Sequence, residues 1–253
     1  MFPIRFFIFA LLLGWLPAPA QSGEAPREVT AEMVQIPAGT YSQGCDRFGP
    51  QHGAPVHRVY LDAFMIDKYE VTNQKFEEVF PEHKLRRSQF SKCDRCPVSK
   101  VNWYEAADYC HLVGKALPSE AQWERAAAGK NGCEFPWGPA FDPQMKQARA
   151  GLVLRANAAP VGSHPPNALG IYDMAGNMWE WVSDWFSIDY YYLGDLYNPR
   201  GPINGIMKVR RGGSWSDSIK AMATGYRDWS YPFSRGFNDI GFRCALTLRP
   251  KKK

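Results

Sequence analysis

The chain has 253 residues and a formal charge of +5, from 30 Lys and Arg against 25 Asp and Glu. Acidic and basic residues are interspersed along it, which argues against a nucleic-acid partner. The length suits one large domain, no linker rich in Pro, Gly and Ser divides it, and aromatic residues are abundant, with nine Trp in the whole chain.

The first twenty residues predict a secretory signal peptide. Arg5 precedes an apolar run from Phe6 to Leu16, and Ala18-Pro-Ala20 then offers a small-residue cleavage site. The alternative is an N-terminal core helix, and the run is too short to span a bilayer. We expect a signal peptide over 1–20, a flexible lead-in over 21–32, one domain over 33–249 and a basic tail over 250–253. Such a protein is periplasmic or secreted and has no stable membrane anchor after cleavage.

Short strands are expected first. Residues 33–41 predict a strand, a turn at Ala38-Gly39 and a second strand. Between Arg58 and Ile66, apolar residues alternate with polar ones, which predicts one half-buried strand. Its inward-facing residues are Val59, Leu61, Ala63 and Met65.

Helices are expected next. The segment Thr72–Phe80 has apolar residues at helical spacing, and Pro81 ends it. Asn102 and Glu105 form a capping box ahead of an apolar stripe made of Trp103, Ala106, Ala107 and Cys110, so that Cys110 lies on the buried face. A second capping box, Ser119-Glu-Ala-Gln122, predicts a helix that ends at Gly129.

The second half of the chain is dense in Gly, Pro, Asn and Trp. It offers short β runs near Met178–Val182, Met207–Arg211 and Phe242–Leu248. More than a hundred residues with so few long elements is unusual for a compact domain. We therefore expect aromatic packing, buried polar side chains, disulfides or metal ions to hold this half together.

Six cysteines in an exported chain favour disulfides. Cys93-Asp-Arg-Cys96 also has the CxxC spacing of redox and zinc sites, but a second CxxC or a His pair at ligand spacing does not accompany it, which disfavours zinc. Pro97 follows, and the segment is typical of a loop rather than the start of a helix. A structural pair is favoured, with thiol redox chemistry as the alternative.

Three strings in the second half carry the most information. They are Gly176-Asn-Met-Trp-Glu-Trp181, Arg211-Gly-Gly-Ser-Trp215 and Gly241-Phe-Arg-Cys-Ala245. In this order they resemble the formylglycine-generating enzyme family, also called sulfatase-modifying factors. The resemblance covers most of the domain and implies an α+β, formylglycine-generating-enzyme-like fold with low regular secondary structure, distantly similar to C-type lectins.

The resemblance also implies structural calcium. Its ligands would be the side chains of Asp173 and Glu180 with the carbonyl groups of Gly176 and Met178, and a weaker second site would lie near Asn157 and Ala158. Hard oxygen donors around a glycine turn suit Ca²⁺. The alternative is that the two carboxylates hydrogen-bond loop amides, and the acidic loop that completes the second site is missing here.

A disulfide between Cys110 and Cys244 is likewise implied by the resemblance. The remaining cysteines are Cys45, Cys93, Cys96 and Cys133, and they can pair in three ways, between which the sequence does not choose.

Family enzymes bind copper(I) through two cysteines just after the Gly-Gly-Ser motif. Ser216, Asp217 and Met222 stand in that region here. Soft thiolates suit copper(I), whereas a hydroxyl and a carboxylate do not replace them. The sequence therefore disfavours a copper centre and the copper-dependent oxidase reaction.

The family's substrate groove lies beside the same turn. Its candidate residues here are Ser214, Trp215, Asp217, Arg227, Trp229 and Arg243. The alternative places Trp215 in the core and pairs the two arginines with buried carboxylates.

Besides the thiol redox alternative at Cys93 and Cys96, two functions remain open. The first is a periplasmic binding or maturation-accessory factor for an unknown peptide or small molecule. The second is a metal- or O₂-dependent oxidoreductase that acts on a peptide or a peptide-derived substrate with non-cysteine ligands near Asp217.

Overall fold

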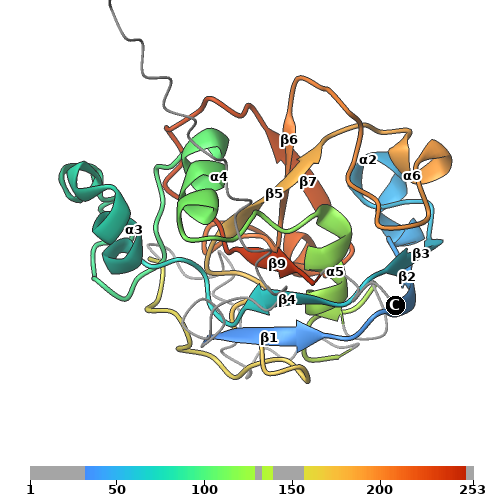
Figure 1. The fold of residues 1–253 in the computed structure, drawn as a ribbon, viewed down its shortest axis with the longest axis horizontal. Coiled ribbons are helices and arrows are strands. Elements are labelled where there is room, and N and C mark those ends of the chain that lie inside the picture. Colours follow the sequence, from blue (N-terminus) through green and yellow to red (C-terminus); the bar gives the residue numbers. More distant parts are fainter. Residues whose placement is uncertain (1–31, 129–132, 139–156, 249–253) are drawn as a thin grey trace, which may run out of the picture.

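Figure 1 shows the computed structural model, which describes residues 32–128, 133–138 and 157–248. The expected signal peptide, nearly all of the lead-in, the helix end at Gly129 and the basic tail lie outside the described residues. Short strands and helices joined by long loops make up the described part, so the expected α+β fold with low regular secondary structure is confirmed.

The first half contains β1 (Met33–Ile36), β2 (Gly39–Gln43), η1 (Asp46–Phe48), α2 (Gly49–His52), β3 (His57–Leu61), β4 (Phe64–Asp67), α3 (Asn73–Val79), η2 (Pro81–Arg86), α4 (Trp103–Leu112) and α5 (Glu120–Ala128). The second half contains β5 (Trp179–Trp185), α6 (Tyr190–Leu193), β6 (Lys208–Arg211), η3 (Ile219–Met222), β7 (Arg227–Ser230), β8 (Ile240–Gly241) and β9 (Ala245–Thr247). The η elements are 3₁₀ helices.

The strands form three small sheets. β4 pairs antiparallel with both β1 and β9, and β2 pairs antiparallel with β3. The third sheet has the order β7-β6-β5-β8, and β5 runs parallel to β8. In Figure 1, β1 and β4 lie below β5, β6 and β7, α4 lies to the left of β5, and α5 lies below and to the right of β7.

The predicted single strand from Arg58 to Ile66 is wrong, because the segment forms β3 and β4 in two different sheets. The break lies at Asp62, whose amide donates to Oδ1 of Asn198 at 2.8 Å. The break shifts the alternation by one residue. Phe64 and Ile66 are therefore fully buried, in place of the predicted Ala63 and Met65.

Both predicted capping boxes are present. Oδ1 of Asn102 accepts from the amide of Glu105 at 2.9 Å, and Oε2 of Glu105 accepts from the amide of Asn102 at 2.9 Å. Ser119 and Gln122 make the same reciprocal pair ahead of α5. These local contacts satisfy amides that a helix start leaves without intrahelical partners, which is why the sequence located both helices.

All six cysteines form disulfides, and the predicted pair Cys110 and Cys244 is confirmed. This bond joins α4 to the segment before β9. The four cysteines whose pairing the sequence left open are bonded as Cys45 with Cys133 and Cys93 with Cys96.

β5 packs between two hydrophobic clusters and contributes side chains to both. Successive side chains of a strand point to opposite faces, and here both faces are buried. Trp179 and Trp181 pack into one cluster, with Phe242 and the disulfide of α4. Val182 packs into the other cluster, with Trp123 of α5. Glu180 therefore projects into the interior beside Trp123.

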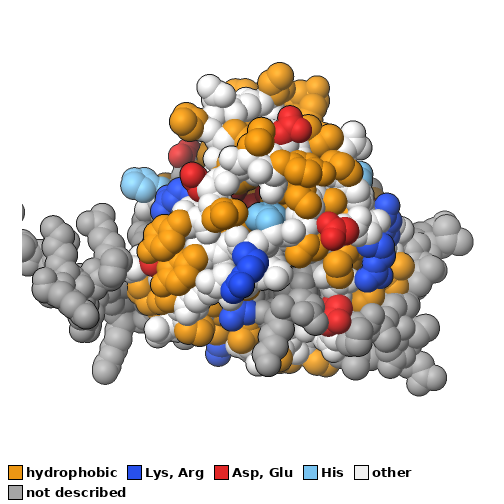
Figure 2. Space-filling model, turned by 90° about the vertical axis from the view of Figure 1, so that its right-hand side faces the viewer, with side chains coloured by type: hydrophobic (Ala, Val, Ile, Leu, Met, Phe, Trp, Pro, Cys, Tyr) orange, Lys and Arg blue, Asp and Glu red, His pale blue; other side chains and the backbone are white. Residues whose placement is uncertain are grey.

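Exposed apolar side chains gather on one segment, residues 188–206, around α6. They are Ile188, Tyr192, Leu193, Leu196, Tyr197, Ile203 and Ile206. Figure 2 views the molecule from the side on which α6 lies in Figure 1, and hydrophobic side chains cover much of that face. Scattered single exposures are normal on protein surfaces, whereas this run is concentrated. Within the described ranges, no helix has the length and apolar character needed to cross a bilayer.

Candidate functional site

The predicted groove lies where β6 ends in two glycines. Gly212 and Gly213 both have positive φ, 95° and 69°. A Cβ on Gly212 would lie 3.1 Å from the ring of Trp123, and one on Gly213 would lie 3.1 Å from the backbone of Ala221. Glycine is therefore needed at both positions, since a side chain would be strained as well as crowded. The turn carries the chain sharply from β6 to Ser214.

A cluster of hydroxyls and carboxylates follows the turn, made of Ser214, Ser216, Asp217 and Asp239. The Ser214 hydroxyl donates to Oδ2 of Asp217, and the Ser216 hydroxyl donates to Oδ2 of Asp239 at 3.0 Å. Nε1 of Trp179 donates to the same Asp217 oxygen at 2.7 Å. We call these four residues the hydroxyl–carboxylate cluster.

The electrostatics of the cluster favour a proton or a hydrogen-bond donor. Burial raises the pKa of Asp217 and the charge of Asp239 adds to the shift, while the hydrogen bonds from Ser214 and Trp179 and the charge of Arg210 offset part of it. The Ser214 hydroxyl lies within hydrogen-bonding distance of both carboxylates. A hydrogen-bond donor at this place reduces the electrostatic repulsion between Asp217 and Asp239. The guanidinium of Arg210 lies 4.6 Å from the ring centre of Trp179, but it pairs with Asp228, with Nη2 2.8 Å from Oδ2.

Trp215 forms one side of this surface. Its indole stacks on Phe90, with ring centres 4.9 Å apart, and its amide donates to the carbonyl of Asn177 at 3.0 Å. The ring is partly exposed and its buried Nε1 has no partner among the described atoms. Trp215 therefore lies beside Ser214 and Asp217, and its place in a substrate groove stays a prediction.

The structure does not bring Arg227 and Trp229 into the hydroxyl–carboxylate cluster. Arg227 is fully buried, and its guanidinium binds both carboxylate oxygens of Glu120 at 2.9 and 2.7 Å. Trp229 stacks on Phe186 with ring centres 4.1 Å apart. Trp229 follows Asp228 in β7, and successive side chains of a strand point to opposite faces of the sheet. Trp229 therefore lies on the face opposite to Asp228.

Arg243 is also part of the interior. It is fully buried, and its Nε and Nη2 donate to the two oxygens of Glu180 at 2.7 and 2.6 Å. The paired arrangement that was the alternative for Arg227 and Arg243 is the one found. Arginine forms such bidentate pairs because its planar fork matches a carboxylate.

The expected calcium ligand Glu180 is occupied by these contacts. Besides the two bonds from Arg243, Oε2 accepts from Nε1 of Trp123 at 2.8 Å. A calcium ion at this carboxylate would compete with the Arg243 guanidinium for the same two oxygens. Among the described residues, no three His, Cys, Asp or Glu side chains are grouped so as to hold a metal ion. The calcium expectation stays a prediction.

Asp173 lies on the loop before β5, in a positive-φ conformation. Its Oδ2 accepts from the amide of Gly162 at 2.7 Å, and its Oδ1 lies 3.3 Å from Nδ1 of His164. Of the two candidates for the weaker calcium site, Ala158 is buried and donates its amide to the carbonyl of Phe90. Asn157 is exposed.

Glu70 is a buried carboxylate that the sequence did not single out as a site residue. Its Oε2 accepts from Nδ2 of Asn177 at 2.6 Å, and its Oε1 accepts from the amide of Met178 at 3.1 Å. Burial raises its pKa well above the ordinary value, and the charges of Asp173 and Glu180 add to the shift. The signal available was the Glu70-Val-Thr-Asn73 string, in which a lone acid follows a strand.

The positions that the resemblance assigns to a thiol pair carry other chemistry. Ser216 and Asp217 belong to the hydroxyl–carboxylate cluster. Met222 is fully buried and packs against Ala175. Because every cysteine is held in a disulfide, the chain offers no free thiol to this surface.

A cavity of about 310 Å³ lies elsewhere, between α4, α5 and residues 198–200. Several of its polar groups are bonded to neighbouring groups of the protein. Nζ of Lys115 donates to Oδ1 of Asp67 at 2.6 Å, and Nε2 of Gln122 donates to Thr247 at 3.3 Å. The cavity has the size of a ligand site, but the motif residues of the glycine turn do not line it, so the cluster after that turn remains the stronger candidate.

Fold and site together define an α+β domain whose loops are held by disulfides and buried arginine–glutamate pairs. The family model for the sulfatase-modifying factor enzyme 1-like domain matches residues 18–248, and the chain belongs to this family.

Comparisons with individual proteins agree with that assignment. The chain is 34% identical to the serine/threonine-protein kinase pkn1 of Chlamydia pneumoniae over 88% of its own length, and it spans 39% of that relative's length. It is 33% identical to the formylglycine-generating enzyme of Streptomyces coelicolor, covering 90% of this chain and 95% of the enzyme. Treponema denticola variable protein 1 has a similar solved structure, with a TM-score of 0.76, 25% identity, and coverage of 85% of this chain and 94% of that one.

Proposed function

We propose that this chain is a binding or maturation-accessory factor that holds a peptide or peptide-derived ligand at the hydroxyl–carboxylate cluster, without a thiolate copper centre. One observation carries the proposal. Ser214, Ser216, Asp217 and Asp239 present hydroxyls and carboxylates beside the glycine turn, and all cysteines are engaged in disulfides.

The chemistry of the cluster indicates the kind of ligand. Carboxylates accept hydrogen bonds, and they bind most strongly to charged N–H donors. The ammonium group of a lysine, a guanidinium or a free amino terminus would lie between Asp217 and Asp239 and relieve their repulsion. The partly exposed face of Trp215 next to the cluster offers an apolar contact to the adjoining part of the ligand.

An exported location is part of the proposal. The signal-peptide pattern at the N-terminus supports it, as do three disulfides, because such bonds persist in oxidising compartments. The periplasm or the exterior would provide that environment.

Binding to short immobilised peptides of random sequence tests the proposal. The full chain is expected to select peptides with a basic residue, and Asp217→Asn is expected to abolish that selection. Asp195→Asn, on an exposed loop, is the matched control and should leave it intact. Metal content is measured on the same samples. Stoichiometric copper or iron that Asp217→Ala removes would instead favour a metal-dependent oxidoreductase and overturn the proposal.

A further inference from the structure

The three disulfides differ sharply in their accessibility. Cys110 and Cys244 are fully buried, and so is Cys45, whereas its partner Cys133 is partly exposed. Cys93 is exposed, while its partner Cys96 is only 5% exposed. Thiol–disulfide exchange requires a thiolate to reach one sulfur of the bond. The Cys93–Cys96 bond therefore joins a cysteine that is exposed to solvent with one that is buried.

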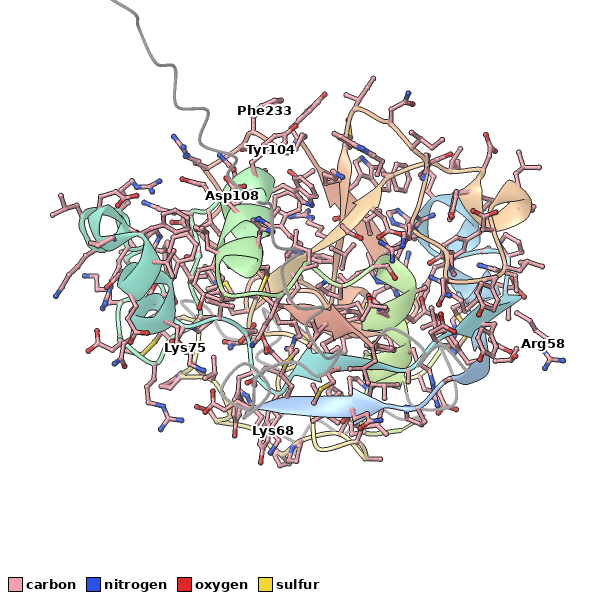
Figure 3. The ribbon with its side chains drawn as sticks, in the orientation of Figure 1. Arg58, Lys68, Lys75, Tyr104, Asp108 and Phe233 are labelled. Carbon is pink, nitrogen blue, oxygen red and sulfur yellow. A yellow bond between two sulfur atoms is a disulfide. The ribbon has the colours of Figure 1, made fainter. Side chains whose placement is uncertain are left out.

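The loop that carries this disulfide is held in place by the start of α3. Nδ2 of Asn73 donates to the carbonyls of Ser91 and Cys93 at 2.7 and 2.9 Å, and the backbone amide of Asn73 donates to the carbonyl of Cys96 at 2.9 Å. The next amide, of Gln74, donates to the carbonyl of Asp94 at 3.0 Å. Figure 3 labels Lys75 in this first turn of α3.

These contacts make the disulfide dispensable for the shape of the loop. The bond spans a sequence separation of three residues, against 88 and 134 for the other two. A short span restricts the unfolded chain little, so the bond contributes less to stability than the other two. Loss of this bond therefore removes less stability than loss of either of the other two.

The surroundings suit a thiolate and an incoming partner. Two cations, Lys92 and Arg95, flank Cys93 in the sequence and are exposed. Positive charge nearby favours the thiolate form of a cysteine. An open cleft of about 400 Å³ adjoins the loop, lined by Gln74, Glu77, Glu78, Pro81, Lys84, Arg87 and Asp94. This lining is polar and carries both signs of charge, which suits a polar, charged thiol.

We propose that Cys93–Cys96 is a thiol–disulfide exchange site that oxidises polar thiols, either small molecules or exposed cysteines of a peptide. The thiolate of the partner attacks Sγ of Cys93, the bond between the two sulfurs breaks, and Cys96 leaves as a thiolate. A second partner thiolate then attacks the partner sulfur of the mixed disulfide and releases Cys93. Two thiols become one disulfide, and the two electrons reside in the reduced Cys93 and Cys96 pair until another disulfide reoxidises it.

The two cysteines lie outside the hydroxyl–carboxylate cluster, although Phe90 of the same loop stacks on Trp215. Selective reduction provides the first test. The full oxidised chain is incubated with reduced glutathione, quenched with iodoacetamide and mapped by peptide mass. Cys93 and Cys96 should be labelled about tenfold or more faster than Cys110 and Cys244, with unchanged circular dichroism. Equal labelling, or unfolding that accompanies the labelling, would overturn the proposal.

Two single variants test which sulfur is attacked. With oxidised glutathione, Cys96→Ser leaves an exposed Cys93 and should gain one glutathionyl group. Cys93→Ser leaves a sheltered Cys96 and should gain little. Equal or reversed modification contradicts the assigned direction of attack.

Turnover is tested with a reduced dithiol peptide and oxidised glutathione as the terminal oxidant. Wild type should accelerate oxidation of the peptide, and the double variant Cys93→Ser/Cys96→Ser should not, although its melting temperature stays close to that of wild type. Equal rates of peptide oxidation for the two proteins would contradict an exchange activity of the Cys93–Cys96 disulfide.

Discussion

Asp184 of β5 is expected to make the stability of the protein depend on pH. Its carboxylate is buried, and its Oδ2 accepts from the amide of Glu120 at 2.9 Å and from the Ser183 hydroxyl at 2.8 Å. Burial, reinforced by the charge of Glu120, raises the pKa of Asp184 from 3.8 to about 7. Two accepted hydrogen bonds and the more distant charge of Arg227 offset only part of that shift.

The sign follows from proton binding. Between pH 4 and pH 7 the native protein keeps a proton on Asp184 that the unfolded chain has lost, so the free energy of unfolding falls as pH rises through this window. Below it both states are protonated, and above it the loss is complete. A difference of about three pKa units corresponds to roughly 4 kcal/mol at 1.36 kcal/mol per unit.

The substitution Asp184→Asn removes this titration and keeps an oxygen that can accept from Glu120. Urea unfolding at about pH 5 and pH 8 measures the effect, and wild type should lose more stability between the two than the variant does. Asp189→Asn, at the exposed start of α6, is the matched control and should behave as wild type. Parallel pH curves for wild type and Asp184→Asn would refute the reasoning.

Further predictions concern the buried pairs, the long disulfide and calcium. Arg243→Met should lower the free energy of unfolding, measured with urea, by about 3–5 kcal/mol because it leaves the buried Glu180 carboxylate without its cation. The double variant Arg243→Met/Glu180→Met should recover most of that stability. A double variant no more stable than Arg243→Met would contradict the pairing. Cys110→Ser should lower the free energy of unfolding by about 5 kcal/mol, because the lost disulfide spans 134 residues. An unchanged urea midpoint would contradict a stabilising role of this disulfide. A calcium chelator should lower the melting temperature of wild type but not of Asp173→Asn, measured by thermal unfolding, since a ligand of the native state stabilises it; an unchanged wild-type curve would contradict calcium binding.

Features fixed by neighbouring residues could be predicted from the sequence. The capping pair Asn102 and Glu105 lies within one helical turn, and the inward placement of Cys110 follows from the helical period. The two short strands at the start of the domain, β1 and β2, depend on alternation and a turn. In each case the determining contact spans only a few residues.

Features that depend on contacts between distant residues could not be predicted from the sequence. The break between β3 and β4 depends on Asn198, which reaches Asp62 from 136 residues away. The burial of Arg227 depends on Glu120, 107 residues earlier. An arginine beside a glycine turn looks the same in sequence whether it meets a ligand or a buried carboxylate.

The candidate site was predicted in part for the same reason. Ser214, Trp215 and Asp217 follow the turn directly, so the sequence placed them together. Asp239 joins them from a loop before β8, 25 residues after Ser214, and carries no motif of its own. Only the folded chain brings the second carboxylate to the cluster.

The affinity of a basic peptide for the cluster is the most direct measurement. Fluorescence polarisation with one labelled peptide, selected by the immobilised panel, compares wild type, Asp217→Asn and the control Asp195→Asn at neutral pH. Loss of a charged partner should weaken binding about tenfold or more for Asp217→Asn and leave the control unchanged. Equal affinity of all three proteins would contradict a ligand site at the hydroxyl–carboxylate cluster.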